Sequence, residues 1–232
     1  MTMLITSIIL SGGRATRMNC VDKGLVLLQK KPLIAHVIAR LKPQVDEIFI
    51  NANREIEQYR VFGFPVIQDE DADFIGPLAG FSLGLQHAKH DYVLTVPCDS
   101  PLLPLDLVER LYNGMAASRM DIACASSGGN THPVFCLMKK SVLPSLLAYI
   151  ESGERKVSAW QKSQQYIEVD CSDCDETFTN LNTFEDLGAL ELGLKKHPLP
   201  NPSPIKSEGL THTGGFVFKS PDSKPKCGDK MG

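Results

Sequence analysis

The chain has 232 residues, a formal net charge of −3 and 43% hydrophobic residues. This length fits one α/β domain with a sizeable core plus an extension, and the near-neutral charge argues against a basic, nucleic-acid-binding domain. No apolar run reaches the ~18–20 residues that a membrane span requires, and residues 1–4 lack the charged start of a secretory signal. We therefore expect a cytoplasmic protein that binds neither nucleic acid nor a membrane.

The first predicted strand leads into a glycine turn rich in positive charge. The apolar run Ser7-Ile8-Ile9-Leu10 predicts a buried strand. Gly12-Gly13 follows it and allows backbone N–H groups to approach a bound anion, and Arg14, Arg17 and Lys23 come soon after. Together these features indicate a phosphate-binding loop, with an ordinary strand-to-helix turn and solvated basic residues as the alternative. The loop lacks the Lys-Ser/Thr of a P-loop and the third glycine of a dinucleotide fingerprint, which disfavours ATPases and dehydrogenases.

Short apolar strands then alternate with helices. Apolar spacing predicts helices at 33–41 and 76–87, a short polar helix ending at 58, and strands at 47–50, 65–67 and 92–96. This alternation predicts an α/β, Rossmann-like fold with a mostly parallel sheet and helices on both faces. In such sheets ligands bind at the carboxyl ends of the strands. We therefore expect the glycine loop, Asn51, Asp69 and Asp99 to converge on one rim, because each follows a strand.

The second half of the chain is less regular and ends in a segment of different composition. We expect helices at 105–115, 141–150 and 183–194, with Thr183 as the N-cap of the last, and strands at 122–125, 134–138, 166–169 and around Phe178. From His197 onward, alternating prolines and scattered Gly, Ser and Lys predict a disordered tail at 197–232. The folded domain is therefore expected to span residues 1–196.

The seven cysteines are expected to be free thiols. Cys171 and Cys174 have the C-x-x-C spacing of zinc and redox sites, but no second pair or H-x-x-x-H partner accompanies them. We therefore expect this pair to have a structural role.

Asp99 directly follows the strand at 92–96, within Pro97-Cys98-Asp99-Ser100-Pro101. A carboxylate there can hold Mg²⁺, which prefers one or two carboxylates together with phosphate oxygens and water. An aspartate that only caps a turn or a helix has the same position in sequence, and Asn51 and Asp69 share this alternative. The residues alone leave these choices open.

The opening stretch, Leu10-x-Gly12-Gly13-x-x-x-Arg17-Met18 followed by Asp22-Lys23, resembles the molybdenum cofactor guanylyltransferase family of nucleotidyltransferases. The resemblance continues along most of the chain. Ser11 stands where the family more often has Ala, and Asn19-Cys20 stand where Gly-Gly is usual. The resemblance implies a nucleotide-diphospho-sugar transferase-like fold. It also implies transfer of GMP from GTP to molybdenum-bound molybdopterin, which forms the guanine dinucleotide cofactor and releases pyrophosphate.

The same resemblance implies roles for individual residues. The Pro-Cys-Asp-x-Pro segment is similar to the family's magnesium site, so Asp99 would hold Mg²⁺ and act with Lys23 and Arg17 in catalysis. The GTP-binding set would be Leu10, Ser11, Gly12, Gly13, Lys23, Asn51, Asp69, Pro77, Leu78 and Asp99. The acceptor-binding set would be His132, Arg155, Asn180 and Asn182.

The residues themselves also allow plainer interpretations of the acceptor set. His132 can be a buried structural histidine, Arg155 a solvated helix end, and Asn182 a cap for the following helix. Beyond GTP and the molybdenum-bound molybdopterin acceptor, the family implies proteins of cofactor biosynthesis and of apo-enzyme delivery as further partners.

Two other functions stay open. The segment Gly76-Pro77-Leu78-Ala79-Gly80, shared with the family, favours guanylyl over cytidylyl transfer, and the absence of a D-x-D motif disfavours a sugar-nucleotide glycosyltransferase. A cytidylyltransferase or sugar-phosphate nucleotidyltransferase is nevertheless the first alternative. The second is a GTP-binding regulatory protein without catalysis, which the Asn19-Cys20 departure supports.

Overall fold

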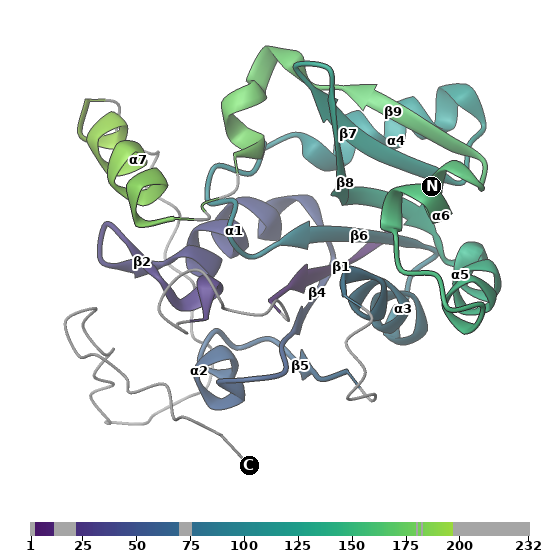
Figure 1. Ribbon diagram of the computed structural model, residues 1–232, viewed down its shortest axis with the longest axis horizontal. Coiled ribbons are helices and arrows are strands. Elements are labelled where there is room, and N and C mark those ends of the chain that lie inside the picture. Colours follow the sequence, from purple (N-terminus) through teal and green to yellow (C-terminus); the bar gives the residue numbers. More distant parts are fainter. Residues whose placement is uncertain (1–2, 12–21, 70–75, 180, 182, 197–232) are drawn as a thin grey trace.

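The structure, a computed structural model, describes residues 3–11, 22–69, 76–179, 181 and 183–196. These residues form one seven-stranded sheet in the order β5-β4-β1-β6-β8-β7-β9 (Figure 1). The pairs β5–β4, β4–β1, β1–β6 and β7–β9 are parallel. Among the described strands of this sheet, β8 alone is antiparallel to its neighbours. The predicted α/β fold with a mostly parallel sheet is therefore confirmed.

The element boundaries agree closely with the sequence pattern. The strands of the large sheet are β1 Ile5–Leu10, β4 Glu47–Asn51, β5 Val66–Ile67, β6 Tyr92–Pro97, β7 Ile122–Ser127, β8 Asn130–Lys139 and β9 Tyr166–Asp170. The helices are α1 Leu33–Leu41, α2 Ile56–Arg60, α3 Pro77–His87, α4 Leu107–Ser118, α5 Leu143–Glu151, α6 Val157–Lys162 and α7 Phe184–Lys196. A small hairpin pairs β2 Leu27–Leu28 with β3 Lys31–Pro32.

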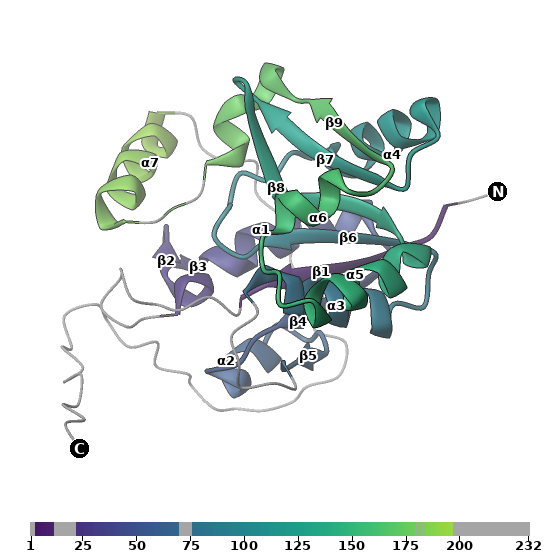
Figure 2. The same cartoon turned by 45° about the vertical axis from the view of Figure 1, so that its right-hand side comes forward.

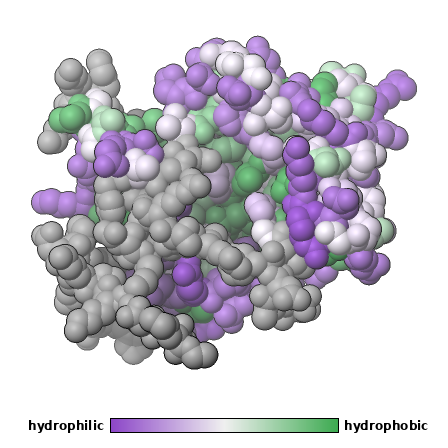
Figure 3. Space-filling model, in the orientation of Figure 1, coloured by the Kyte–Doolittle hydropathy of each residue, from purple (hydrophilic) through white to green (hydrophobic). Residues whose placement is uncertain are grey.

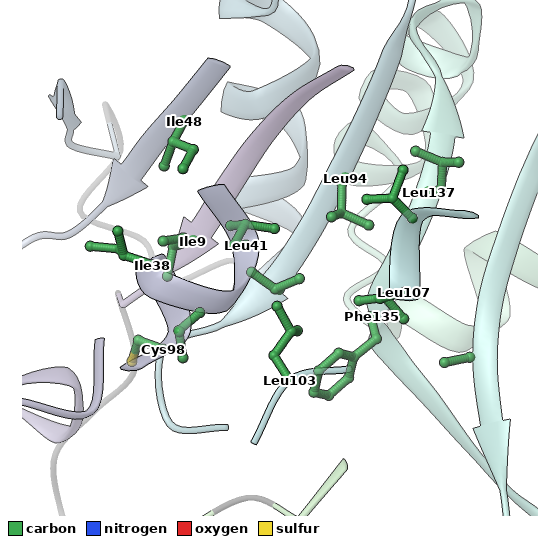
Figure 4. Packing of buried hydrophobic residues seen from close by; sticks show 14 of the residues in the cluster. Ile9, Ile38, Leu41, Ile48, Leu94, Cys98, Leu103, Leu107, Phe135 and Leu137 are labelled. Atoms are coloured by element: carbon green, nitrogen blue, oxygen red, sulfur yellow. The ribbon is translucent and has the colours of Figure 1, made fainter. Parts of the chain in front are cut away.

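Helices cover both faces of the sheet, as the alternation of elements predicts (Figure 2). Residues of α1 and α4, such as Ile38 and Leu107, pack with Ile9 and Leu94 of the strands in one buried cluster (Figure 4). On the other face, α3, α5 and α6 pack in a second cluster that contains the fully buried Trp160. Strands buried on both faces must be apolar throughout, which explains the continuous apolar runs in the sequence.

The last helix lies beside the β2–β3 hairpin (Figures 1 and 2). Leu194 of α7 packs with Leu28 of the hairpin. The helix begins as predicted: the Thr183 N–H donates to Asp186 Oδ2 at 2.9 Å, and the Asp186 N–H donates to Thr183 Oγ1 at 3.1 Å. This reciprocal pair stabilises the N-terminus of the helix. The tail at 197–232 lies outside the described residues.

One predicted strand is wrong. Phe178 belongs to the 3₁₀ segment Ser172–Phe178, which follows β9. Its burial comes from ring contacts with His132 and Phe135, at centroid distances of 4.8 Å and 5.0 Å. A single apolar residue does not reveal whether its burial comes from a sheet or from aromatic packing, because both need the same side chain.

The thiols of the described cysteines are free, as predicted. Cys124 and Cys136 lie opposite each other on β7 and β8, and the Cys174 Sγ contacts the Cys171 carbonyl at 3.4 Å. No helix within the described residues is both long enough and apolar enough to cross a bilayer.

Candidate active site

The carboxyl ends of β1, β4, β5 and β6 meet at one rim of the sheet. Leu10 pairs in register with Asn51 on one side and with Pro97 on the other, and Asn51 pairs with Ile67. Just beyond this row, the Ser11 N–H donates to the Asn51 carbonyl at 2.8 Å. The polar residues that follow these strands therefore lie close together, as the parallel arrangement predicts.

Lys23 and Asp99 form an ion pair across this rim. The Lys23 Nζ lies 3.1 Å from Asp99 Oδ2. Lys23 opens the short 3₁₀ turn Lys23–Leu25, and Asp99 follows the last residues of β6. The Asp99 residue is only 7% exposed, whereas the Lys23 side chain is 27% exposed. Two residues predicted for catalysis thus contact each other although they lie far apart in sequence.

A buried carboxylate fixes the turn that carries Lys23. The Asp22 Oδ1 accepts hydrogen bonds from the Gly24 N–H, at 3.3 Å, and from the Tyr59 hydroxyl. A Cβ atom at Gly24 would lie 2.6 Å from the Tyr59 hydroxyl oxygen and 3.2 Å from the Cys98 Cβ, so only glycine fits there. Burial raises the pKa of Asp22, and the Tyr59 hydrogen bond opposes that rise.

The sequence pattern does not predict this arrangement. It marks Asp22 only as part of the Asp-Lys pair, and nothing near Tyr59 in the sequence indicates its partner in the turn. Tyr59 lies on α2, is fully buried, and has a pKa raised mainly by burial. Because α2 follows β4, the strand that ends at Asn51, the turn is anchored by an element distant from it in sequence.

The end of β4 holds Asp69 with two asparagine side chains. The Asn51 Nδ2 donates to Asp69 Oδ1 at 2.9 Å and to the Ile67 carbonyl at 3.3 Å. The Asn53 Nδ2 donates to Asp69 Oδ2 at 2.6 Å, and the Asp69 N–H donates to Asn53 Oδ1 at 2.8 Å. Asn51 and Asp69 are predicted site residues, and the structure brings them together. Asn53 is not among the predicted residues, although it ends the same Ile-Asn-Ala-Asn segment.

The first turn of α3 packs directly against these strand ends. A Cβ atom at Gly80 would lie 2.4 Å from Leu10 Cδ2 and 2.8 Å from Asn51 Oδ1, so glycine is required for this close approach. Pro77 begins the helix and is exposed, whereas the Leu78 side chain is fully buried. Leu78 therefore belongs to the core behind the rim, next to the exposed Pro77.

The two described members of the predicted acceptor set, His132 and Arg155, lie on the other half of the sheet. Because β8 runs antiparallel to β6, its first residues, including His132, lie toward the same rim. The His132 ring stacks on Phe178 at 4.8 Å, and its Nε2 lies 2.7 Å from Ser127 Oγ. Burial lowers the pKa of His132, and the Asp175 carboxylate opposes that change. These contacts fit a structural role at least as well as a direct contact with a ligand.

Arg155 lies in the loop between α5 and α6. Its guanidinium is exposed and donates from one nitrogen to the carbonyls of Ile150, at 3.0 Å, and Glu154, at 2.8 Å. Gly12, Gly13, Arg17, Asn180 and Asn182 lie outside the described residues. Leu181, between the last two, is buried, and its N–H donates to the Asp99 carbonyl at 3.1 Å.

Asp99 has the chemistry of a magnesium ligand. Within the residues that the structure describes, no three or more His, Cys, Asp or Glu side chains gather as a metal cluster. Mg²⁺ commonly binds through one or two carboxylates and completes its shell with phosphate oxygens and water. A single rim carboxylate beside Lys23 therefore fits a Mg²⁺ ion that arrives with a nucleotide better than a resident structural metal. Figure 3 shows, on the side of the molecule drawn in Figure 1, a central hollow with apolar residues at its floor and hydrophilic residues above it and to its right.

The sequence is similar to those of a known protein family. The family model of the MobA-like NTP transferase domain matches residues 7–167. The molybdenum cofactor guanylyltransferase of Shewanella putrefaciens is 48% identical over 186 residues, which cover 80% of this chain and 95% of the relative. The protein of the same name from Polynucleobacter asymbioticus is 50% identical over 194 residues, which cover 82% of this chain and 97% of the relative.

Solved structures are similar in fold. Molybdopterin-guanine dinucleotide biosynthesis protein A of Archaeoglobus fulgidus superposes with a TM-score of 0.69 at 20% identity, over 82% of this chain and 99% of that chain. CMP:2-keto-3-deoxy-manno-octonic acid synthetase, solved with CTP, superposes with a TM-score of 0.62 at 14% identity, over 85% of this chain and all of that chain. At these identities the likeness shows a shared nucleotidyltransferase-type fold and no more.

Proposed function

The chain belongs to the MobA-like NTP transferase family, and we propose that it transfers GMP from GTP to molybdenum-bound molybdopterin. The observation that carries this proposal is the high identity to molybdenum cofactor guanylyltransferases along nearly their whole length. An oxygen of the acceptor phosphate would attack the α-phosphorus of GTP. The bond between the α-phosphorus and the bridging oxygen would break, and pyrophosphate would leave with that electron pair.

The residues of the rim would supply position and charge. The acceptor phosphate is already anionic near neutral pH, so the reaction needs no general base, and transfer relies on alignment and electrostatics. Lys23, with Arg17 and the amides of Gly12-Gly13, would bind the triphosphate and stabilise the charge on the leaving pyrophosphate. The ion pair with Asp99 supports this role, because it holds the Lys23 ammonium at the rim before the nucleotide binds.

Asp99 would hold Mg²⁺, and its single rim carboxylate supports this assignment. When bound, Mg²⁺ neutralises phosphate charge and helps to align the reacting oxygens. The Asp99 backbone has a separate role, because its carbonyl accepts from the Leu181 N–H and thereby links the rim to the segment that leads into α7.

The nucleoside would lie over the ends of β1 and β4. Leu10, Ser11, Asn51, Asp69 and Pro77 line this part of the rim. The buried Leu78, also in the proposed GTP-binding set, would support the turn at Pro77. The glycine at position 80 supports this arrangement because it lets the first turn of α3 approach Leu10 and Asn51 closely at the strand ends.

The acceptor would lie toward β8, where His132 and Arg155 belong to its proposed binding set. Asn180 and Asn182 complete the proposed set. The exposed guanidinium of Arg155 can bind a pterin phosphate through two parallel hydrogen bonds. Transfer of the product to apo-enzymes would involve further proteins of cofactor biosynthesis and delivery. The buried free thiols support a reducing, cytoplasmic location.

The test is a pyrophosphate-release assay with GTP, Mg²⁺ and molybdenum-loaded molybdopterin, beside a control without acceptor and a parallel reaction with CTP. We expect release that requires the acceptor and GTP. Faster release with CTP than with GTP would favour a cytidylyltransferase. Binding of GTP without release for molybdopterin or sugar-phosphate acceptors would favour a regulatory protein.

A further inference from the structure

The Asn53 side chain forms two hydrogen bonds with Asp69. Its Nδ2 donates to the Asp69 carboxylate at 2.6 Å, while its Oδ1 accepts from the Asp69 backbone N–H at 2.8 Å. The Asn51 amide holds the other carboxylate oxygen at 2.9 Å. The side chain and the backbone of Asp69 are therefore both fixed, by residues on and just after β4.

This pair of hydrogen bonds requires a carboxamide side chain at position 53. Only a side chain that carries a donor and an acceptor on one short arm can bind both groups of Asp69. A carboxylate has room for about four hydrogen bonds, so the two asparagine donors leave capacity for further donors from a ligand. Asn53 therefore fixes the orientation of the Asp69 carboxylate, and with it the direction from which a ligand can donate a hydrogen bond.

We propose that Asn53 is a positioning residue for nucleotide recognition: it aims the Asp69 carboxylate at donor groups on the nucleoside. The inference rests on the proposed function, in which Asp69 contacts GTP. Two parts of GTP carry suitable donors, namely the guanine edge with its 2-amino group and N1–H, and the ribose with its 2′-hydroxyl. Both would hydrogen-bond to the same carboxylate.

A double-mutant cycle tests whether Asn53 acts through Asp69. GTP affinity is measured by calorimetry, without acceptor, for the wild type, Asn53→Ala, Asp69→Ala and the double variant. We expect Asn53→Ala to raise the Kd for GTP roughly tenfold, in line with the loss of a hydrogen bond to a charged group. In the Asp69→Ala background the same change should have almost no effect, because residues that act through one another are not additive.

Asn53→Asp separates positioning from a merely structural role. The new carboxylate keeps an acceptor for the Asp69 N–H, so it preserves the backbone contact, but it places a like charge against Asp69 Oδ2. We expect it to weaken GTP binding at least as much as Asn53→Ala does. The exposed Asn113 of α4 provides the control: Asn113→Ala should leave the Kd unchanged.

Two analogues of GTP identify which group of the nucleoside donates to the Asp69 carboxylate. If Asp69 reads the guanine edge, the effect of Asn53→Ala should shrink with ITP, which lacks the 2-amino group. If it reads the ribose, the effect should shrink with 2′-deoxy-GTP. An effect that persists in full with both analogues would assign the contact to the donors that they keep, N1–H or the 3′-hydroxyl. Additive losses in the cycle, or a wild-type Kd in Asn53→Asp, would overturn the proposal. A wild type that binds GTP but releases no pyrophosphate would instead contradict the proposed function and leave this test intact.

Discussion

The two halves of the rim are built differently. Where β1, β4, β5 and β6 end, polar side chains hold one another: Lys23 contacts Asp99, and Asn51 and Asn53 hold Asp69. Toward β8, the two described acceptor candidates have other partners. His132 lies in an aromatic stack, and Arg155 donates to carbonyls of its own loop and of α5.

This difference indicates a division of labour. Groups already held in place lose little freedom when a ligand binds, so a preorganised site stabilises charge at low cost. The nucleotide half fits that description. On the β8 half, the exposed Arg155 uses only one guanidinium nitrogen for its local hydrogen bonds, so the donors on its other nitrogens could bind a ligand. Substitutions in the two halves should therefore affect different kinetic constants.

The largest effect should come from the Lys23–Asp99 pair. Lys23→Ala or Asp99→Ala should each lower the rate of pyrophosphate release by on the order of 10²–10³, because each removes charge stabilisation from the transferring group. Both variants should keep the wild-type circular dichroism spectrum. Lys89→Ala is the matched control: it breaks a surface ion pair with Glu47, and it should leave the rate unchanged.

The anchor beneath Lys23 should have a smaller effect. Tyr59→Phe removes the hydroxyl donor from the buried Asp22 carboxylate, so it should lower the free energy of unfolding by about 1–3 kcal/mol. It should also reduce turnover, because the turn that carries Lys23 loses its fixed position. Thermal melts and pyrophosphate release measure the two effects. A variant that melts early but turns over normally would show that Tyr59 serves the fold alone.

A substitution in the acceptor half should change a different kinetic constant, the KM for the acceptor. Arg155→Ala should raise the KM for molybdenum-loaded molybdopterin roughly tenfold, since a charge-assisted pair with phosphate is lost. The KM for GTP should stay as in the wild type. Lys162→Ala, which removes an exposed partner of Glu168 on the same half, is the control. A parallel rise in the KM for GTP would contradict the division between the halves.

The smallest expected effect is a pH dependence of stability on the acceptor side. Burial lowers the pKa of His132 below its usual 6.5, so the folded protein favours the neutral ring. The contribution of His132 to the free energy of unfolding is fully present above pH 6.5 and is lost as the pH falls toward and through the lowered pKa. His132→Gln cannot titrate, so its free energy of unfolding should fall less between pH 7 and about pH 5. Identical pH profiles for the two proteins would show that His132 contributes nothing to this dependence.

The parts of this site that the sequence predicts are those set by the strand pattern. Asn51, Asp69 and Asp99 each follow a short apolar strand, and parallel strands bring such residues to one rim. The helix at Thr183 was predictable because its cap uses residues close in sequence. Local patterns of this kind determine where an element begins and which end of the sheet carries polar groups.

The contacts that the sequence did not predict join distant residues. Tyr59 reaches Asp22 from another element, and nothing in the residues around either one indicates the contact. In the sequence, Asn53 is indistinguishable from an ordinary turn residue. Only the structure shows that its partner is Asp69. The strand prediction at Phe178 is wrong because the burial of that ring depends on His132 rather than on its neighbours in the chain.

The most direct test of the account is a double-mutant cycle on Lys23 and Asp99, with the rate of GMP transfer from GTP to molybdenum-loaded molybdopterin as the readout. If the two side chains act as one unit at the rim, the Lys23→Ala/Asp99→Ala variant should be little slower than either single variant. Losses that simply multiply, or a single variant that transfers GMP at the wild-type rate, would contradict it.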